Sequence, residues 1–314
     1  MAKRVLITGG AGFIGSTIAE LFLGAGWDVA VLDALLTGKR ENVPAGARFY
    51  PVDIRSAAAT EAVKKERPQV ICHHAAQIDV RRSMADPRFD ADVNVGGLLN
   101  LMQAAVEARS VEHVLFASSG GATYGDTDVI PTPESHPQRP VSHYGAAKAA
   151  SEVYLGVYRA GFGIPFTALR YANVYGPRQD PHGEAGVVAI FCGRLLDGKP
   201  CTIYGDGKQT RDYVFAGDVA RANLLAAEKR FDGPLNVGTG IETDVSTIYA
   251  HLARAAGVQL PPELGPARLG EQKRSCVDPS AAAAAIGWRP EVKLEDGLAR
   301  TLEFFRARRG SQDA

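Results

Sequence analysis

Thr8-Gly9-Gly10-Ala11-Gly12-Phe13-Ile14-Gly15 is the stretch of sequence that decides the fold. It follows the apolar segment Arg4–Thr8, an expected strand, and opens the amphipathic segment Phe13–Leu23, an expected helix. In such a turn Gly9 and Gly12 let the backbone approach a pyrophosphate, and Gly15 allows close packing of helix on strand. The helix start adds free N–H groups and a positive dipole end. The order strand, glycine turn, helix therefore predicts a dinucleotide site.

Two acidic residues extend this prediction. Asp33 ends the second expected strand, at about the 20-residue spacing at which a carboxylate holds the ribose hydroxyls of a dinucleotide. A carboxylate there repels a 2′-phosphate, so the sequence favours NAD over NADP, although Lys39 and Arg40 follow nearby. Asp53, after the third expected strand, is a candidate for reading the adenine amino group.

The first half of the chain alternates short apolar runs with longer amphipathic ones, as βαβ units do. The expected strands are Arg4–Thr8, Asp28–Leu32, Arg48–Val52, Val70–His73, His113–Ala117 and Phe166–Arg170, and the expected helices are Phe13–Leu23, Ala57–Glu66, Asn94–Ala108 and Ser142–Arg159. This pattern predicts an α/β fold: a Rossmann-type, doubly wound parallel sheet. After Tyr171 the alternation weakens, which predicts an NAD-binding domain over 1–172 and a smaller α+β substrate-binding domain over 173–314. Segments near 212–237 are expected to return to the main sheet.

A tyrosine and a lysine four residues apart provide candidate chemistry. On a helix, Tyr144 and Lys148 fall on one face. A phenol titrates near pH ~10, and a nearby ammonium together with an oxidised nicotinamide favours the phenolate. The pair predicts proton transfer at a carbon that exchanges hydride with the cofactor. Alone, the same spacing also suits an ordinary surface pair.

Two serines follow the expected strand that ends at Ala117. Ser118 and Ser119 begin a loop at the carboxyl end of the sheet, where ligands bind in this fold. A hydroxyl there can hydrogen-bond the reacting oxygen beside Tyr144. The alternative is that these serines only cap a turn.

Bulk composition excludes several other classes of function. Lys plus Arg equals Asp plus Glu at 35 each, so no net charge favours nucleic acid or an anionic membrane surface. The cysteines Cys72, Cys192, Cys201 and Cys276 lie far apart, which predicts reduced thiols and no metal site. The short apolar run at the N-terminus predicts neither a signal peptide nor a membrane span, so a cytoplasmic protein is expected.

Further segments carry a resemblance that covers nearly the whole chain. They are Leu36-Thr37-Gly38-Lys39-Arg40, Asp53-Ile54, His74-Ala75-Ala76-Gln77, Asn94, Leu169-Arg170-Tyr171-Ala172-Asn173, Tyr204-Gly205-Asp206-Gly207, Arg211-Asp212-Tyr213 and Arg268-Leu269-Gly270-Glu271. Together with the glycine turn and the Tyr/Lys pair, they resemble the extended short-chain dehydrogenase/reductase family. Within this family, the chain looks like the 4-epimerases of the UDP-glucose/UDP-galactose type.

The resemblance implies roles for individual residues. The NAD contacts would be Gly9, Gly12, Phe13, Ile14, Gly15, Asp33, Gly38, Asp53, Ile54, Ala75, Ala76, Gln77, Asn94, Tyr144 and Lys148. The nucleotide-sugar contacts would be Ser119, Tyr144, Asn173, Val187, Tyr204, Arg211, Arg268, Glu271 and Ser275. Two arginines among them suit a diphosphate, since guanidinium groups bind phosphate oxygens in pairs.

The implied reaction inverts C4 of the sugar. Tyr144 removes the 4-hydroxyl proton while NAD takes hydride, the 4-keto sugar turns over, and hydride and proton return to the other face. Many relatives place the catalytic Ser or Thr where this chain has Gly120. Ser119 is therefore the expected catalytic hydroxyl, with Ser118 in reserve.

Three other functions remain as alternatives. A 4,6-dehydratase needs an acid and a base at positions that are Gly121 and Ala122 here, and the same gap opposes the decarboxylases of the family. A UDP-glucuronate 4-epimerase resembles this chain but has arginine where Asp180 stands, and aspartate repels the sugar carboxylate. A non-catalytic nucleotide-binding relative should have lost Tyr144 or Lys148.

Two further expectations come from the family. Ser275 aligns with a gate position that a bulky tyrosine fills in enzymes restricted to glucose and galactose. A small residue there predicts tolerance of N-acetylhexosamines as well. The family also implies a homodimer, formed through the helices expected near Asn94–Ala108 and Ser142–Arg159.

Overall fold

The computed structural model describes residues 2–181, 186–267 and 272–310 of the chain. Its main sheet has seven parallel strands in the order β10-β6-β5-β4-β1-β2-β3. The strands are β1 (Arg4–Thr8), β2 (Asp28–Leu32), β3 (Arg48–Tyr50), β4 (Val70–His73), β5 (His113–Ser119), β6 (Phe166–Tyr171) and β10 (Gly233–Val237). The strand order reverses between β1 and β4. Ligands bind at such a switch point, beyond the carboxyl ends of the strands.

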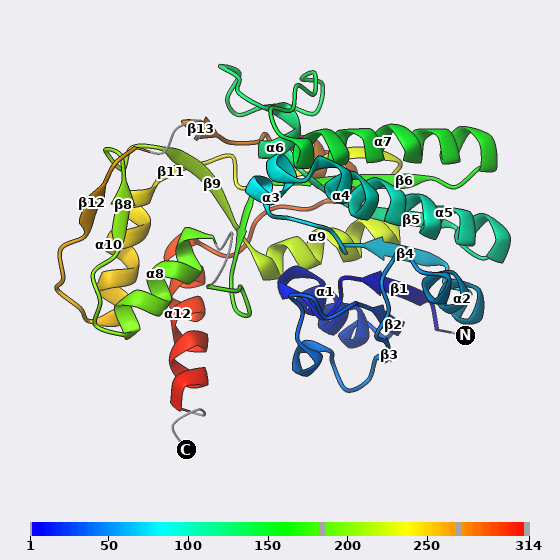
Figure 1. Ribbon diagram of the computed structural model, residues 1–314, viewed down its shortest axis with the longest axis horizontal. Helices are drawn as coiled ribbons and strands as arrows, with labels where there is room; N and C mark the ends of the chain where they lie inside the picture. The colour runs from blue at the N-terminus through cyan, green and yellow to red at the C-terminus, as the bar shows by residue number, and fades with distance from the viewer. Residues whose placement is uncertain (1, 182–185, 268–271, 311–314) are drawn as a thin grey trace.

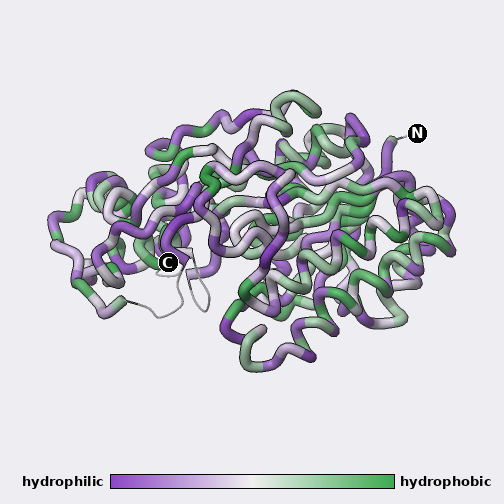
Figure 2. The backbone as a smooth tube through the Cα atoms, turned by 90° about the horizontal axis from the view of Figure 1, so that it is seen from above, coloured by the Kyte–Doolittle hydropathy of each residue, from purple (hydrophilic) through white to green (hydrophobic). Residues whose placement is uncertain are grey.

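Helices cover both faces of this sheet (Figure 1). They are α1 (Phe13–Gly24), α9 (Ala216–Lys229) and α11 (Ser280–Ile286) on one face, and α2 (Ala57–Glu66), α5 (Gly97–Ala108) and α7 (His143–Phe162) on the other. Alternate strand residues feed the two cores: Ile7 packs toward α1, and Leu6 packs toward α2. The strands are accordingly among the most hydrophobic parts of the chain (Figure 2).

A second, smaller unit lies beside the carboxyl ends of the strands (Figure 1). It contains β7 (Asn173–Tyr175), β9 (Thr210–Phe215), β11 (Glu242–Asp244) and β13 (Arg274–Ser275) in one sheet, and β8 (Thr202–Tyr204) with β12 (Glu263–Gly265) in another. The helices α8 (Val187–Leu196), α10 (Val245–Ala256) and α12 (Leu294–Gly310) pack on these strands around a third core. We call this unit the cap.

Short elements complete the chain near the switch point. They are η1 (Arg40–Asn42), α3 (Val80–Ala85), α4 (Pro87–Ala91), the π-helical turn η2 (Asp92–Gly96) and α6 (Gly120–Tyr124). A π turn inside a longer helix frequently marks a functional site. Here it interrupts the helix expected over Asn94–Ala108, which becomes regular only from Gly97.

The expected Rossmann-type sheet is confirmed, although β5 and β6 run two residues and one residue further than expected and two larger differences occur. β3 ends at Tyr50 and not at Val52, since Pro51 between them has no N–H to donate to the sheet. Of the segments expected to return to the main sheet, α9 and β10 do so, whereas Asp212 lies on β9 in the cap sheet. The exact domain boundary at residue 172 stays a prediction.

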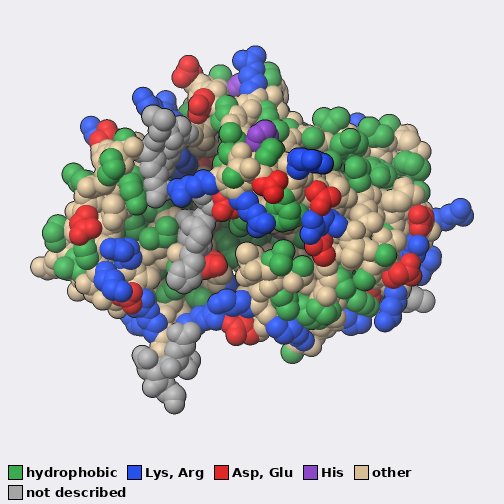
Figure 3. Space-filling view, viewed as in Figure 1, with side chains coloured by type: hydrophobic (Ala, Val, Ile, Leu, Met, Phe, Trp, Pro, Cys, Tyr) green, Lys and Arg blue, Asp and Glu red, His purple; other side chains and the backbone are tan. Residues whose placement is uncertain are grey.

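All four cysteines are buried and free. None of the helices in the described part of the chain is both long and apolar enough to span a membrane. On the face shown in Figure 3, positive and negative side chains of the described residues are interspersed.

Candidate active site

The glycine turn packs directly against the segment that follows β4. A Cβ atom added at Gly9 would lie 2.6 Å from the backbone nitrogen of Ala75, and one at Gly15 would lie 2.3 Å from the Gly9 carbonyl oxygen. Gly9 also has a φ of +70°, which side chains oppose. The Thr8 hydroxyl then accepts hydrogen bonds from the N–H groups of His74 and Ala75, both at 3.2 Å. The turn and the predicted contact Ala75 therefore meet at the switch point, with Ala76 next along the chain.

The turn fits the phosphates of a dinucleotide. Gly12 is the N-cap of α1, and no side chain caps the helix there. The amide groups of the first turn, which include those of Phe13 and Ile14, are thus left for an external anion, in the positive end of the helix dipole. A Cβ at Gly12 would come within 3.2 Å of the Gly9 carbonyl oxygen and crowd the cradle.

Asp33 is held rigidly beside this turn. Its carboxylate accepts hydrogen bonds from the N–H groups of Ala11 at 3.0 Å and Leu35 at 2.8 Å. A Cβ at Gly38 would lie 3.0 Å from the Asp33 carboxylate and from Ala11, so glycine suits that position. The carboxylate keeps spare lone pairs that could accept from ribose hydroxyls, and this predicted contact stays a prediction.

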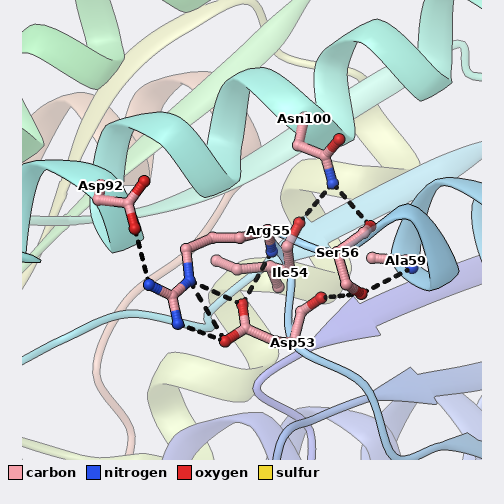
Figure 4. Close-up of polar contacts among 7 residues, drawn as sticks. All are labelled: Asp53, Ile54, Arg55, Ser56, Ala59, Asp92 and Asn100. Atoms are coloured by element: carbon pink, nitrogen blue, oxygen red, sulfur yellow. Dashed lines mark hydrogen bonds and ion pairs between the residues drawn. The ribbon is translucent and has the colours of Figure 1, made fainter.

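Asp53 is engaged by a residue that sequence reasoning missed (Figure 4). The Arg55 guanidinium donates to both oxygens of Asp53, at 3.0 and 2.6 Å, and to Asp92 at 2.7 Å. Hydrogen bonds from Arg55 hold the pKa of the Asp53 carboxyl below its usual range. Asn100 donates to the backbone carbonyls of Ile54 and Ser56, which fixes this loop. The predicted adenine contact is thus an ionised, well-positioned carboxylate.

Gln77 and Asn94 form a reciprocal pair. The Gln77 N–H donates to the Asn94 side-chain oxygen, and the Asn94 amide donates to the Gln77 carbonyl, each at 3.0 Å. Asn94 lies in the π turn and is 3% exposed. This pairing holds the loop after β4 against the helix that precedes α5.

The structure brings Tyr144 and Lys148 together at the end of β5. The Lys148 ammonium lies 5.7 Å from the centre of the Tyr144 ring and donates to the carbonyl of Ala117 at 2.8 Å. The Tyr144 N–H donates to the Ser83 hydroxyl at 3.2 Å, a contact that the sequence did not predict. Ser142 caps the helix by accepting from the Gly145 N–H at 3.1 Å.

The electrostatics of this pair differ from the expectation for the chain on its own. Burial lowers the pKa of Lys148 to about 8, although Asp90 and Glu152 oppose this. Burial, assisted by Asp90, raises the pKa of Tyr144 to about 12. The acidified phenol expected from the Tyr/Lys spacing is therefore not a property of the chain without its cofactor. Additional positive charge at the site is needed to favour the phenolate.

The two serines have different surroundings. Ser118 is 3% exposed, and its hydroxyl donates to Glu152 at 2.6 Å. Glu152 in turn forms a buried ion pair with Arg170, so the Ser118 hydroxyl is part of this buried group. Ser119 is partly exposed and accepts from the Ala122 N–H at 3.3 Å at the start of α6. A Cβ at Gly120 would lie only 2.6 Å from a methyl group of Val277. Val277 thus occupies the space that a serine at position 120 would need.

The cap brings Arg211 and Ser275 next to α6. Arg211 on β9 pairs in register with Ser275 on β13, so their side chains share one face of the sheet. A Cβ at Gly121 would lie 3.0 Å from the Ser275 hydroxyl oxygen. The predicted gate residue Ser275 therefore lies beside Gly121 of α6, two residues after Ser119.

The remaining predicted substrate residues lie elsewhere in the cap. Asn173 is exposed on β7 and pairs in register with Tyr213 of β9. Val187 begins α8, and Tyr204 ends β8. Arg268 and Glu271 fall outside the described residues.

Comparison with known proteins identifies the family. Residues 5–238 match the NAD dependent epimerase/dehydratase family. The chain is 46% identical to a UDP-glucose 4-epimerase of Mycolicibacterium smegmatis over 309 residues, which covers 96% of this chain and 98% of the relative.

The chain belongs to the NAD dependent epimerase/dehydratase family.

Two solved structures of this family are similar throughout. UDP-glucose 4-epimerase of Thermotoga maritima, with UDP-glucose, is 43% identical at a TM-score of 0.94, over 97% of this chain and 99% of that one. UDP-glucose 4-epimerase of Thermus thermophilus, in complex with NAD, is 47% identical at a TM-score of 0.91, over 96% and 99%. The expected family, fold, enzyme class and NAD cofactor are thereby confirmed.

Within this family the serines give a direct test of site assignment. We expect Ser119→Ala to lower kcat by about 10²-fold, because the hydroxyl would bond the oxygen at which charge develops. Ser118→Ala should retain most activity and lose about 1 kcal/mol of unfolding free energy with its hydrogen bond to Glu152. Steady-state rates and thermal unfolding of both variants check this. A larger fall in kcat for Ser118→Ala, at unchanged stability, would reverse the assignment.

Proposed function

We propose that this protein interconverts UDP-glucose and UDP-galactose by inverting C4 of the hexose. The observation that supports this best is the Tyr144/Lys148 pair at the end of β5, close to residues 118–122, which include no further acid or base. Gly121 and Ala122 have no proton-transferring side chain, so the elimination performed by a dehydratase has no catalyst there. A relative called UDP-glucose 4-epimerase at 46% identity, and one called putative UDP-glucose 4-epimerase at 40%, support the same substrate.

The proposed mechanism needs few groups from the chain. Bound NAD supplies reversible acceptance of a hydride from C4. Tyr144 takes the proton of the 4-hydroxyl as the C4–H bond breaks, and Ser119 donates a hydrogen bond to the same oxygen. Once the 4-keto sugar has turned about its diphosphate link, Tyr144 returns the proton. Lys148 contributes a positive charge, and Arg211 is proposed to hold the diphosphate.

Incubating the purified protein with UDP-galactose, without added NAD, tests this function. Appearance of UDP-glucose by chromatography is the expected result, because the cofactor is regenerated in each turnover and stays bound. No conversion, even after NAD is added, would contradict the proposal and reopen the dehydratase alternative.

A uronate substrate is disfavoured for an electrostatic reason. The segment that supplies an arginine in the glucuronate enzymes has Asp180 here, and Arg178 is engaged by Glu20 of α1 through two hydrogen bonds at 2.7 and 2.6 Å. A sugar carboxylate close to Asp180 would therefore meet repulsion, and the neighbouring Arg178 is already paired with Glu20.

Ser275 is proposed to set the tolerance for N-acetylhexosamines. Ser275→Tyr should lower kcat/KM for UDP-N-acetylgalactosamine at least tenfold more than for UDP-galactose, because the ring would fill the space beside Gly121. Parallel kinetics with both substrates measure this ratio. Equal losses on the two substrates would remove the gate argument.

We also propose a homodimer in the cytoplasm. Support for the dimer comes from α7, where Val153, Tyr154 and Val157 are 68%, 42% and 58% exposed on the outer face. Such a cluster of apolar side chains on one helix favours association. The four free, buried cysteines agree with a reducing compartment.

A further inference from the structure

Asp90 on α4 is a buried carboxylate to which the proposed mechanism gives no role. Asp90 is only 1% exposed. One carboxylate oxygen, Oδ1, accepts hydrogen bonds from the side-chain amides of Gln77 at 2.9 Å and Asn94 at 3.1 Å. The other oxygen, Oδ2, is buried and accepts none from the residues that the structure describes. A buried carboxylate with an unsatisfied oxygen is costly, so its position calls for a compensating interaction.

The elements around Asp90 hold it against the helix of the Tyr/Lys pair. α4 packs on α7, and the neighbouring α3 accepts the Tyr144 N–H through Ser83. From α7, the Ser151 hydroxyl donates to the Asn94 carbonyl at 3.5 Å, next to one of the two amides that fix Asp90. The negative charge of Asp90 raises the pKa of Tyr144 and the pKa of Lys148.

We propose that Asp90 is a positioning residue that acts through its charge, as the buried counter-ion that keeps Lys148 an ammonium beside Tyr144. Gln77 and Asn94 would then have a second function besides their predicted cofactor contacts. They hold the Asp90 carboxylate in place through one oxygen on α4, the helix that packs against α7 and its Lys148.

Of the two carboxylates that raise the pKa of Lys148, Asp90 and Glu152, Asp90 is the larger contributor. Glu152, one turn further along α7, is neutralised by Arg170 at 2.6 Å. His73, the last residue of β4, and His74, which follows it, are neutral, because burial and the Lys148 charge lower their pKa values to about 3. Arg82 on α3 lies over the ring of Phe89 at 4.1 Å and only adds positive charge nearby. Glu152 thus has a cationic partner of its own, whereas the Asp90 carboxylate forms no ion pair with the residues that the structure describes.

Asp90→Asn isolates the charge from the hydrogen bonds. The asparagine side-chain oxygen can keep both bonds from Gln77 and Asn94, while the amide group replaces the oxygen that has no partner. A merely structural role for Asp90 therefore predicts little change. A charge role predicts that Lys148 loses its proton at a lower pH.

The test is an NMR titration of Lys148 in protein carrying ¹³C-labelled lysine, with the signal assigned through Lys148→Met. In Asp90→Asn the titration should move down by about one pH unit relative to the wild type. Asp92→Asn, two residues away with an exposed carboxylate, is the matched control and should leave it unmoved. An unshifted Lys148 titration in a folded Asp90→Asn protein would overturn the proposal. Asp90→Ser, which is small and uncharged, should give the same shift and stands in if Asp90→Asn does not fold.

A second readout rests on the proposed function. The alkaline limb of the pH dependence of kcat should move in the same direction as the Lys148 titration in Asp90→Asn. Because the NMR arm requires no turnover, a failed epimerase assay would leave that test intact. A Lys148 shift without the expected limb shift would instead show that Lys148 does not need to be charged for turnover, which overturns the positioning role.

Discussion

Tyr144→Phe should lower turnover of UDP-galactose by at least about 10³-fold while the affinity for the UDP-sugar changes little. The substitution removes only the phenolic oxygen, which is the proposed acceptor of the 4-hydroxyl proton. The Tyr144 N–H still donates to Ser83, and the ring still packs beside Lys148. Binding of UDP-glucose by calorimetry and turnover by chromatography together separate the two effects.

Tyr158→Phe is the matched control for this prediction. Tyr158 lies on the same helix and packs on the ring of Phe162, near the opposite end of α7 from Tyr144. Its loss of a hydroxyl should leave turnover close to that of the wild type. If Tyr144→Phe retained near-normal turnover, Tyr144 would not be the base, and the proposed mechanism would fail.

Glu152→Gln should destabilise the fold by about 3–5 kcal/mol, because it leaves the Arg170 guanidinium buried without a counter-charge. The two side chains are 9% and 7% exposed and are joined by hydrogen bonds at 2.6 and 3.1 Å. Arg170 also donates to the Tyr124 hydroxyl at 3.0 Å, at the end of α6. Denaturant unfolding measures the loss, and we expect α6 and its Ser119 to become less ordered as well.

An exposed ion pair supplies the comparison. Glu112 pairs with Arg230, but the side chains are 42% and 57% exposed, so Glu112→Gln should cost less than about 1 kcal/mol. Similar unfolding free energies for Glu152→Gln and Glu112→Gln would show that the buried pair contributes no special stability.

Local chemistry made much of the fold predictable. The glycine turn and Asp33 lie within neighbouring βα units, and their roles depend on backbone geometry that short sequence patterns report. Tyr144 and Lys148 were predictable in the same way, because helical periodicity alone puts them on one face. Similar reasoning found the strands and most of the helices that surround the switch point.

Contacts between segments that are far apart in the sequence could not be predicted from such local patterns. Val277 fills the space beside Gly120, and this explains the absent serine, but the two residues are far apart in sequence. The partners of Asp90 and of Ser118 are likewise set by the packing of α4 and α7 on the sheet. The contact between Arg55 and Asp53 could have been predicted, because an arginine two residues after an aspartate is visible in the sequence.

Incubation of the protein with UDP-glucose carrying deuterium at C4, in ordinary water, tests the central claim most directly. If hydride passes from C4 to the bound cofactor and back within one site, the UDP-galactose formed should retain deuterium at C4. Mass spectrometry and NMR of the product decide the outcome. Loss of the deuterium to solvent would mean that C4 is inverted by another route, and would contradict the proposed roles of Tyr144, Lys148 and the dinucleotide site.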